Sequence, residues 1–311
     1  RVREIENQKS AYSAVIAGLS SGLACAGFIF LLGGGWPEVI CAFLGAGAGN
    51  YVRALMGKRK MTLVAKIAVA VAVACAVYFL TFHIGKMIFH LDYHHAYGYI
   101  GAMLFVIPGF PFITSGLDMS KLDMRSGLER MTYALLIITI ATMSGWAVAT
   151  ILNLHPGSML KLSINPGMLT FLRLIASFCG VFGFSIMFNS RPNMAATAAI
   201  MGAMANTLRL SLVDYAHMAP ALAAFIGALV SGLLASIVRQ KVGFPRIAIT
   251  VPSIVIMVPG LFMYRAVFNF GITNINIGAY WITEALMIVI ALPFGLLAAR
   301  ILTDKKWRHA D

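Results

Sequence analysis

Residues 106–118 read VIPGFPFITSGLD, part of an apolar run that two prolines interrupt. Within a helix, Pro108 and Pro111 have no N–H to donate, so two carbonyls one turn earlier would lack partners. An unpaired carbonyl in hydrocarbon is energetically expensive. The run therefore predicts a broken helix whose carbonyls bind water, the hydroxyl of Thr114 or Ser115, or the ammonium group of a substrate. A plain proline kink satisfied within the helix bundle is the alternative.

A second run of the same kind lies in the other half of the chain. Residues 251–264 read VPSIVIMVPGLFMY, with prolines at Pro252 and Pro259. The Pro-Gly pair at 259–260 follows the pair at 108–109 by 151 residues. Two earlier landmarks recur after 155 to 156 residues, namely Gly27-Phe28 as Gly183-Phe184 and Pro37 as Pro192. This ordered series predicts an internal repeat with one broken helix in each copy.

The composition excludes a soluble globular protein. Of the 311 residues, 60% are hydrophobic and 11% are charged, whereas soluble domains contain about 25% charged residues. Apolar runs of the length that crosses a bilayer lie at 12–32, 37–56, 62–82, 98–117, 131–152, 167–189, 193–210, 218–238, 247–266 and 280–301. We therefore predict an all-α polytopic membrane protein of about ten helices, surrounded by the lipid bilayer.

The net charge of +13 fits membrane topology better than nucleic-acid binding, because the charges lie at the ends of apolar runs. With the N-terminus inside, 19 of the 24 Lys and Arg residues fall in cytoplasmic segments. Both termini are thus predicted to be cytoplasmic. The residues on the outer side are Lys86, Lys161, Arg173, Arg209 and Arg265. Because the chain begins with Arg1 rather than Met, we expect a further segment upstream.

The predicted organisation is a cytoplasmic segment at 1–11, a five-helix half at 12–157 and a second half at 158–311. Five spans is an odd number, so the second half must enter the membrane upside down. Inverted repeats with broken helices near the midplane are typical of secondary transporters. A channel would need a continuous polar stripe, and an intramembrane enzyme would need a nucleophile with a nearby base. The sequence contains neither pattern, and it is compatible with a homo-oligomer.

Acidic residues near membrane depth are scarce, and such residues are usually functional. Asp118, Asp214 and Glu284 are therefore candidate proton carriers. The alternative is that they form interfacial ion pairs, Asp118 with Lys121 or Arg125 and Asp214 with Arg209. A cluster of His83, His90, Asp92, His94 and His95 in an outer loop has only weak metal-like spacing, and no metal site is predicted.

Several short motifs resemble the threonine/serine exporter family. The first-half motifs are Leu32-Gly33-Gly34-Gly35-Trp36, Tyr51-Val52-Arg53, and Pro108-Gly109-Phe110-Pro111 with Asp118. The second-half motifs are Gly183-Phe184, Phe188-Asn189, and the run from Pro252 through Pro259-Gly260 to Tyr264. The resemblance implies export of threonine and serine across the bacterial inner membrane, driven by the proton motive force. It implies no cofactor besides protons. Some members resemble a two-subunit system tied to dicarboxylate (succinate) export.

The matched motif positions supply the candidate binding site for a small polar metabolite. A zwitterionic substrate would place its ammonium group near free carbonyls or Asp118, and its carboxylate near half-helix N-termini or Arg53. A dicarboxylate would need more cations than this core offers, unless Arg173 and Arg209 face inward. The candidate binding residues are Arg53, Pro108, Gly109, Pro111, Thr114, Ser115, Asp118, Asn189, Pro252, Pro259, Gly260 and Tyr264.

Overall fold

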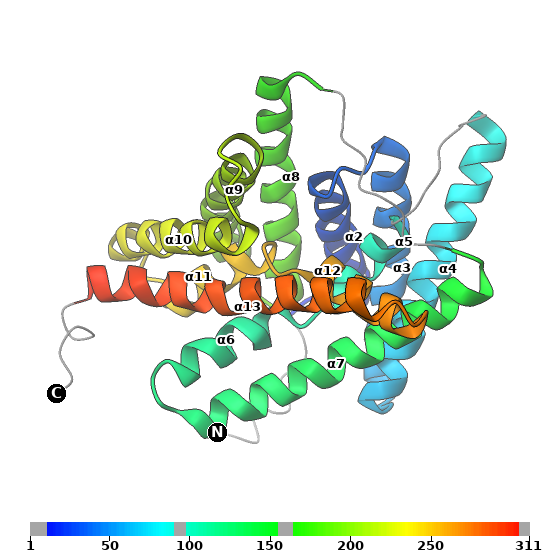
Figure 1. Ribbon diagram of the computed structural model, residues 1–311, viewed down its shortest axis with the longest axis horizontal. Helices are drawn as coiled ribbons and strands as arrows, with labels where there is room; N and C mark the ends of the chain where they lie inside the picture. Colours follow the sequence, from blue (N-terminus) through cyan, green and yellow to red (C-terminus); the bar gives the residue numbers. More distant parts are fainter. Residues whose placement is uncertain (1–10, 90–97, 155–163, 305–311) are drawn as a thin grey trace.

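The computed structural model describes residues 11–89, 98–154 and 164–304, and every regular element in these ranges is helical (Figure 1). The first half contains α2 (Ala14–Leu31), α3 (Trp36–Lys58), α4 (Leu63–Phe89), α5 (Gly98–Met103), the short 3₁₀ helix η1 (Leu104–Val106), α6 (Gly109–Met119) and α7 (Met124–Ile151). The second half contains α8 (Pro166–Met187), α9 (Pro192–Tyr215), α10 (Pro220–Val242), α11 (Arg246–Val255), α12 (Gly260–Gly271) and α13 (Ile275–Thr303). His90, Asp92, His94 and His95 lie outside the described residues.

The described residues contain up to ten membrane spans. Eight are single helices long and apolar enough to cross a bilayer. The other two are bent pairs, α5 and η1 with α6 at 55°, and α11 with α12 at 50°. All ten coincide with the predicted apolar runs, and the two bent pairs contain the Pro-Gly sequences. The all-α polytopic fold is therefore confirmed.

Large apolar side chains cover the outer surface of the helices. Leu19 in α2, Leu80 in α4, Phe171 in α8 and Ile290 in α13 are each more than half exposed. A soluble protein rarely exposes apolar surface on this scale, whereas lipid is an equally apolar environment. The surface composition therefore agrees with contact between these helices and the bilayer.

Each bent span is interrupted by an inverse γ-turn centred on proline. Pro108 has φ −81° and ψ 58°, and Pro259 has φ −83° and ψ 53°. These angles lie close to the inverse γ-turn minimum, in which the residue after the turn bonds back to the residue before it. Proline fixes φ near this value and glycine follows it without a side chain. The repeated Pro-Gly sequence thus produces the same bend in both halves.

The carbonyls at the first break are paired within the backbone. The N–H of Ile107 donates to Leu104 O at 3.1 Å, and the N–H of Gly109 donates to Ile107 O at 2.8 Å. The second break repeats both bonds, at Val255 O and Val258 O. The expectation that prolines leave these carbonyls to water, a hydroxyl or a substrate is therefore wrong for this conformation. The local turn supplies the missing donors instead.

The two halves meet through reciprocal contacts between α2 and α8. A Cβ added to Gly27 would collide with the carbonyl oxygen of Ala176, and one added to Gly183 with that of Ser20. Gly183 follows Gly27 by 156 residues, and Ala176 follows Ser20 by the same interval. The repeat counterparts of Gly27 and Ala176 are Gly183 and Ser20, and these two residues also contact each other. Two copies related by a two-fold axis make paired contacts of this kind.

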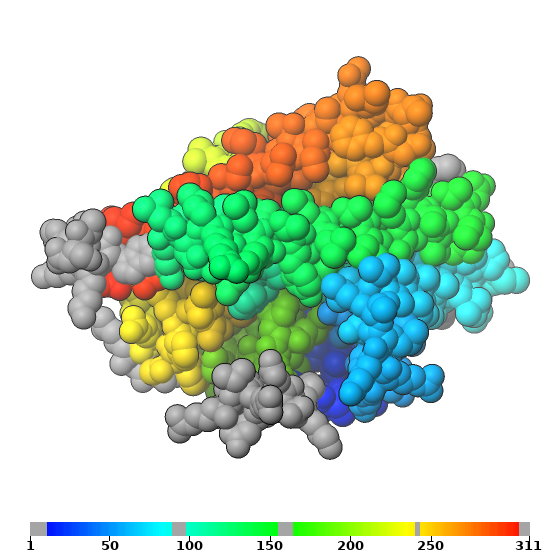
Figure 2. Space-filling model, turned by 90° about the horizontal axis from the view of Figure 1, so that it is seen from below, coloured from blue at the N-terminus to red at the C-terminus, as the bar shows by residue number. Residues whose placement is uncertain are grey.

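Helices α6 and α7 form a band across one face of the molecule, with α12 and α13 along one side of it (Figure 2). Helix α13 contacts α10 and α12 within its own half, and it also contacts α6 from the other half. The bent spans are therefore enclosed by helices from both halves. This arrangement places the two breaks in the interior.

Candidate functional site

The two γ-turn breaks face each other in the protein core. A Cβ on Gly109 would lie 3.1 Å from Cγ2 of Val258, and one on Gly260 would lie 3.1 Å from Cγ1 of Ile107. These contacts are again reciprocal, because Gly260 follows Gly109 by 151 residues and Val258 follows Ile107 by the same interval. The two broken segments therefore approach each other in the structure.

The space between the breaks is closed. The cavity there has a volume of about 10 Å³ and is lined by Phe28, Leu104, Ile107, Gly109, Phe184, Val255, Val258 and Gly260. A water molecule needs about 10–15 Å³ by this kind of measure, so the cavity holds one water at most. The space between the two breaks is therefore too small for a metabolite in this conformation. A substrate that crossed the protein at this point would require the breaks to separate.

A larger cavity opens between α6 and α7. Its volume is about 360 Å³, and its lining is Phe110, Pro111, Thr114, Glu129, Arg130 and Tyr133. The predicted residues Pro111 and Thr114 therefore reach a cavity of substrate size. The predicted cation Arg53 of α3 is not among the lining residues of this cavity.

Thr114 and Ser115 differ in role although they are adjacent. The Thr114 hydroxyl donates to Phe110 O at 3.0 Å within its own helix, and the residue lines the cavity. The Ser115 hydroxyl is fully buried and donates to Gly127 O at 2.6 Å, which ties α6 to α7. Pro252 is likewise buried inside α11. Ser115 and Pro252 therefore position helices and are absent from the lining of the α6–α7 cavity.

Asp118 forms an ion pair with Arg130, with 3.0 Å between Oδ2 and Nη1. An ion pair at Asp118 was the alternative reading of the sequence, but Arg130 is a partner that this alternative did not name. Arg125 pairs instead with Glu129 one turn along α7, at 3.2 Å. Helix periodicity alone could not identify Arg130, because the pair depends on how α7 folds back along α6.

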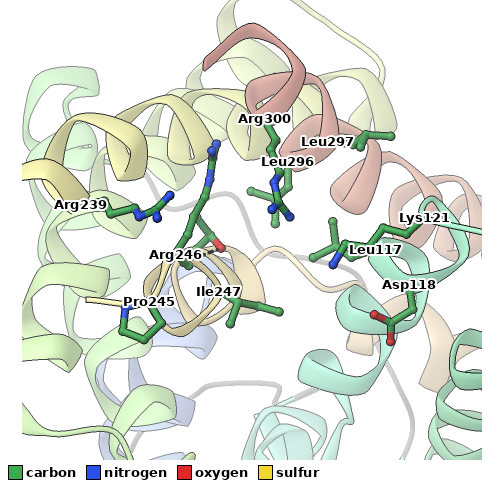
Figure 3. Close-up of a pocket in the computed structure, with 11 residues that line it drawn as sticks. Leu117, Asp118, Lys121, Arg239, Pro245, Arg246, Ile247, Leu296, Leu297 and Arg300 are labelled. Atoms are coloured by element: carbon green, nitrogen blue, oxygen red, sulfur yellow. Dashed lines mark hydrogen bonds between the residues drawn. The ribbon is translucent and has the colours of Figure 1, made fainter. Parts of the chain in front are cut away.

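A second cavity lies on the other side of Asp118 (Figure 3). Its volume is about 340 Å³, and α6, α10, α11 and α13 enclose it. Four cationic residues and one carboxylate lie among the lining residues, which are Leu117, Asp118, Lys121, Arg239, Pro245, Arg246, Ile247, Thr250, Leu296, Leu297 and Arg300. We call this space the cationic cavity. The cations that a dicarboxylate would need are therefore present at these helix ends, whereas the lining between the two breaks contains none.

Asp118 connects the two cavities. It lines the cationic cavity, while its partner Arg130 lines the α6–α7 cavity. Its side chain is 18% exposed, so the carboxylate is accessible without being fully solvated. The Asp118–Arg130 ion pair therefore joins the linings of the two cavities.

The predicted outer residues form a separate polar group between α8 and α9. Asp214 pairs with Arg173 at 2.6 Å, whereas Arg209 was the expected partner. Arg209 instead donates from Nε to Asn206 Oδ1 at 2.9 Å, and Asn206 donates from Nδ2 to Ser177 Oγ at 2.8 Å. The buried chain Ser177–Asn206–Arg209 thus holds these two helices together.

This polar group has a repeat counterpart in the first half that was not predicted from the sequence. Ser21, Asn50 and Arg53 precede Ser177, Asn206 and Arg209 by 156 residues each. In the first half the bonds differ, because Asn50 donates from Nδ2 to Ala17 O at 2.8 Å and Ser21 donates to Ala46 O at 3.0 Å. The shared spacing Asn-x-x-Arg at 50–53 and 206–209 was the signal that could have found it.

Two predicted binding residues lie away from both cavities. Asn189 follows α8 with φ 66°, and Gly33, 156 residues earlier, follows α2 with φ 94°. Both end a helix in the left-handed conformation that Gly and Asn tolerate best. Tyr264 is fully buried, and its hydroxyl lies 3.1 Å from that of Tyr99. Among the candidate proton carriers, Glu284 lies on α13 and is absent from the linings of both cavities.

Glu38 is a buried acidic residue that does not belong to the candidate proton carriers predicted from the sequence. It is 2% exposed in the first turn of α3. A Cβ on Gly35, the residue before that helix, would lie 2.9 Å from Glu38 Oε2. The carboxylate therefore folds back onto its own helix start, where the helix dipole favours negative charge.

Two family models match the chain in succession. The first, described as a putative threonine/serine exporter, covers residues 1–153, and the second, described as a threonine/serine exporter, covers residues 173–302. The chain belongs to the threonine/serine exporter family. Both halves of the family architecture are fused in it, and membership of this family places it among multi-span membrane transporters.

Two relatives of this chain are named as probable succinate transporter subunit YjjP. The Klebsiella aerogenes protein is 29% identical over 131 residues, which cover 42% of this chain and 49% of the relative. The Escherichia coli protein is 28% identical over 141 residues, which cover 44% of this chain and 52% of the relative. The chain thus spans about half the length of these relatives. No solved structure matches this chain.

Proposed function

We propose that this protein is a secondary transporter of the bacterial inner membrane that moves threonine, serine or similar small amino acids out of the cytoplasm. The observation that carries the proposal is the direct contact between two γ-turn breaks, one from each half. Broken helices that meet near the middle of a membrane protein form the substrate sites of many secondary transporters. The proton motive force supplies the energy, and no cofactor is required.

We propose further that the halves are inverted repeats. Each half has five spans when a bent pair counts as one, so consecutive copies enter the membrane in opposite directions. The reciprocal contacts of Gly27 with Ala176 and of Gly183 with Ser20 support a two-fold relation between them. In such transporters the substrate site opens to the cytoplasm in one conformation and to the outside in the other. The transporter changes between the two when one repeat moves against the other.

The cavities support an inward-facing conformation. The linings of both larger cavities include Lys and Arg residues that the charge pattern assigns to the cytoplasmic side, such as Lys121, Arg130 and Arg239. On the side that the charge pattern assigns to the outside, hydrogen bonds join Ser177 to Asn206 and Asn206 to Arg209. When the transporter opens to the outside, these hydrogen bonds would break. New hydrogen bonds would then form among the first-half counterparts Ser21, Asn50 and Arg53.

A zwitterionic amino acid matches the α6–α7 cavity. Arg130 provides positive charge for its carboxylate, and Glu129 provides negative charge for its ammonium group. Asp118 lies next to this cavity through its ion pair with Arg130. The start of α6 lies at the closed centre, where the helix dipole favours an anionic group. A substrate carboxylate would thus be attracted from the cavity toward the break.

Dicarboxylate export is a second candidate. The observation that favours it is the cationic cavity, whose four cationic residues exceed its one carboxylate. The names of the two relatives point to succinate as the dicarboxylate to test. Both candidates share the same route through the two breaks, so they differ in substrate and not in mechanism.

Counterflow in proteoliposomes tests the proposal. Vesicles loaded with unlabelled threonine, serine or succinate are diluted into the labelled compound, and its transient accumulation is measured. Saturable accumulation of threonine and serine supports amino-acid export, and accumulation of succinate alone supports the second candidate. Non-saturable flux that ignores a proton gradient would identify a channel and overturn the proposal.

A further inference from the structure

A pair of tyrosines joins the two halves of the chain in the protein interior. Tyr99 lies in α5 of the first half and Tyr264 lies in α12 of the second half, and both side chains are buried. Their hydroxyl oxygens are hydrogen-bonded at 3.1 Å, and their rings meet edge to face with centroids 5.9 Å apart. Because each half contributes one tyrosine, this hydrogen bond has to break when the two halves move apart at this level.

The tyrosine pair lies on the far side of the two breaks from the larger cavities. Tyr99 precedes Pro108 by nine residues, and Tyr264 follows Pro259 by five. The cavities are lined instead by α6, which follows the first break, and by α11, which precedes the second. A substrate that passed from the α6–α7 cavity between the breaks would therefore reach the tyrosine pair next. The charge pattern assigns Arg265, which directly follows Tyr264, to the outer side.

Neighbouring side chains fill the space around the tyrosine pair. Met103 lies one turn after Tyr99 in α5 and is fully buried. The ring of Tyr264 stacks on that of Phe268, with 6.4 Å between the ring centroids. A Cβ added to Gly145 of α7 would lie 2.6 Å from Sδ of Met103 and 3.1 Å from Cε2 of Tyr264. Helices α5, α7 and α12 are therefore packed closely at this level, in contrast to the open cavities on the other side of the breaks.

The repeat counterparts of the two tyrosines cannot form the same hydrogen bond. In the register of the two breaks, Tyr99 corresponds to Thr250 and Tyr264 corresponds to Ile113, each at an interval of 151 residues. Ile113 has no hydroxyl, and Thr250 lines the cationic cavity. The position of Tyr99 is thus closed on the outer side, whereas its counterpart borders an open cavity. Inverted repeats with one side open are expected to differ in this way.

We infer that the Tyr99–Tyr264 pair is the outer gate of the transport path, an inference that rests on the proposed function. In the closed gate the two buried hydroxyls are each other's partners, so neither is left unpaired away from water. When the gate opens, water can bind both hydroxyls, and the open and closed states then differ only modestly in free energy. The rings exclude water from the breaks, and the hydrogen bond holds α5 to α12 until the halves move.

Thiol labelling from the outside tests the gate. Met103→Cys places a thiol one turn inside the tyrosine pair, and a membrane-impermeant maleimide is added to spheroplasts that contain the full chain. Mass spectrometry identifies the modified residue, which separates this reporter from the four native cysteines. Tyr99→Phe, Tyr264→Phe and the double variant are compared in the reporter background. Tyr280→Phe is the matched control, because Tyr280 is an exposed tyrosine of α13.

We expect each single variant to be labelled about tenfold faster than the reporter parent, because it leaves one buried hydroxyl unpaired in the closed gate. The double variant removes both hydroxyls and should be labelled more slowly than either single variant. Tyr280→Phe should match the parent.

Unchanged labelling in both single variants, or equal acceleration in the control, overturns the proposal. A fall in thermal stability without faster labelling also overturns it, because the pair would then be only structural. So does a double variant that is labelled faster than both single variants, because the two hydroxyls would then act independently. Labelling is measured without substrate or a proton gradient, and threonine counterflow is measured separately in proteoliposomes. A failure of the gate is therefore distinguishable from a failure of the proposed transport function.

Discussion

Asp118 shows how one carboxylate can link two cavities. It lines the cationic cavity and bonds Arg130 of the α6–α7 cavity at 3.0 Å. We propose Asp118 as the proton carrier because it is a carboxylate whose contacts reach both cavities.

Asp118→Asn should abolish proton-driven export and leave exchange within about twofold of the parent, because exchange moves no net protons. Asparagine keeps the shape and one acceptor oxygen but cannot bind and release the proton. The measurement compares accumulation driven by a proton gradient with counterflow in the same proteoliposomes. If the variant still exports threonine against its gradient as well as the parent, Asp118 is only an ion-pair residue. Loss of both activities would mean that Asp118 binds substrate directly.

At the scale of elements, α2 and α8 pack through a pair of repeat-related glycines. Gly27 and Gly183 each lie against a backbone carbonyl of the opposite helix, so a side chain there has no flexible neighbour to displace. Small residues at such crossings let membrane helices approach closely. The two halves are therefore joined at their closest approach by backbone contacts rather than by large side chains.

Gly27→Ala and Gly183→Ala should each destabilise the protein by about 1–3 kcal/mol, the usual cost of overpacking a tight site. Repeat symmetry predicts similar losses for the two variants, measured as a fall in the temperature of thermal unfolding in detergent. Gly85→Ala is the control, because nothing lies within 4 Å of a Cβ at Gly85 in α4. Alanine there should be neutral or stabilising, since it favours helix over glycine. Equal effects of all three substitutions would contradict the packing described for α2 and α8.

The Ser–Asn–Arg groups also belong to the scale of elements. Asn206→Ala removes a buried side chain that bonds both Ser177 and Arg209, and Asn50→Ala removes one bond to Ala17 O. A lost partner for a buried polar group costs about 1–3 kcal/mol. Amide hydrogen exchange, which reports local opening, should therefore accelerate about tenfold in α8 and α9 for Asn206→Ala. Asn50→Ala should act on α2 and α3 instead and by less. Unchanged exchange in α8 and α9 would show that the group does not hold the outer side closed.

For the whole molecule, the sequence predicted most of the architecture and little of the site. Apolar runs located all ten spans, because lipid demands long stretches without charge. The Pro-Gly pairs located both bends, because proline removes a donor wherever it stands. The partner of Asp118 could not be predicted, because it depends on how α6 and α7 pack. The cationic cavity was missed for the same reason, since its arginines come from α10, α11 and α13. The inverted orientation of the halves stays a prediction.

The central claim is that the two breaks must separate for substrate to pass, and a reversible cross-link between them tests it most directly. The chain would carry both Gly109→Cys and Val258→Cys, since a Cβ on Gly109 would lie 3.1 Å from Val258 Cγ2. Each single variant and the parent chain, oxidised in the same way, are the controls. Counterflow in proteoliposomes should stop when mass spectrometry shows the disulfide formed, and should return on reduction. Unchanged counterflow with the disulfide intact would contradict the account.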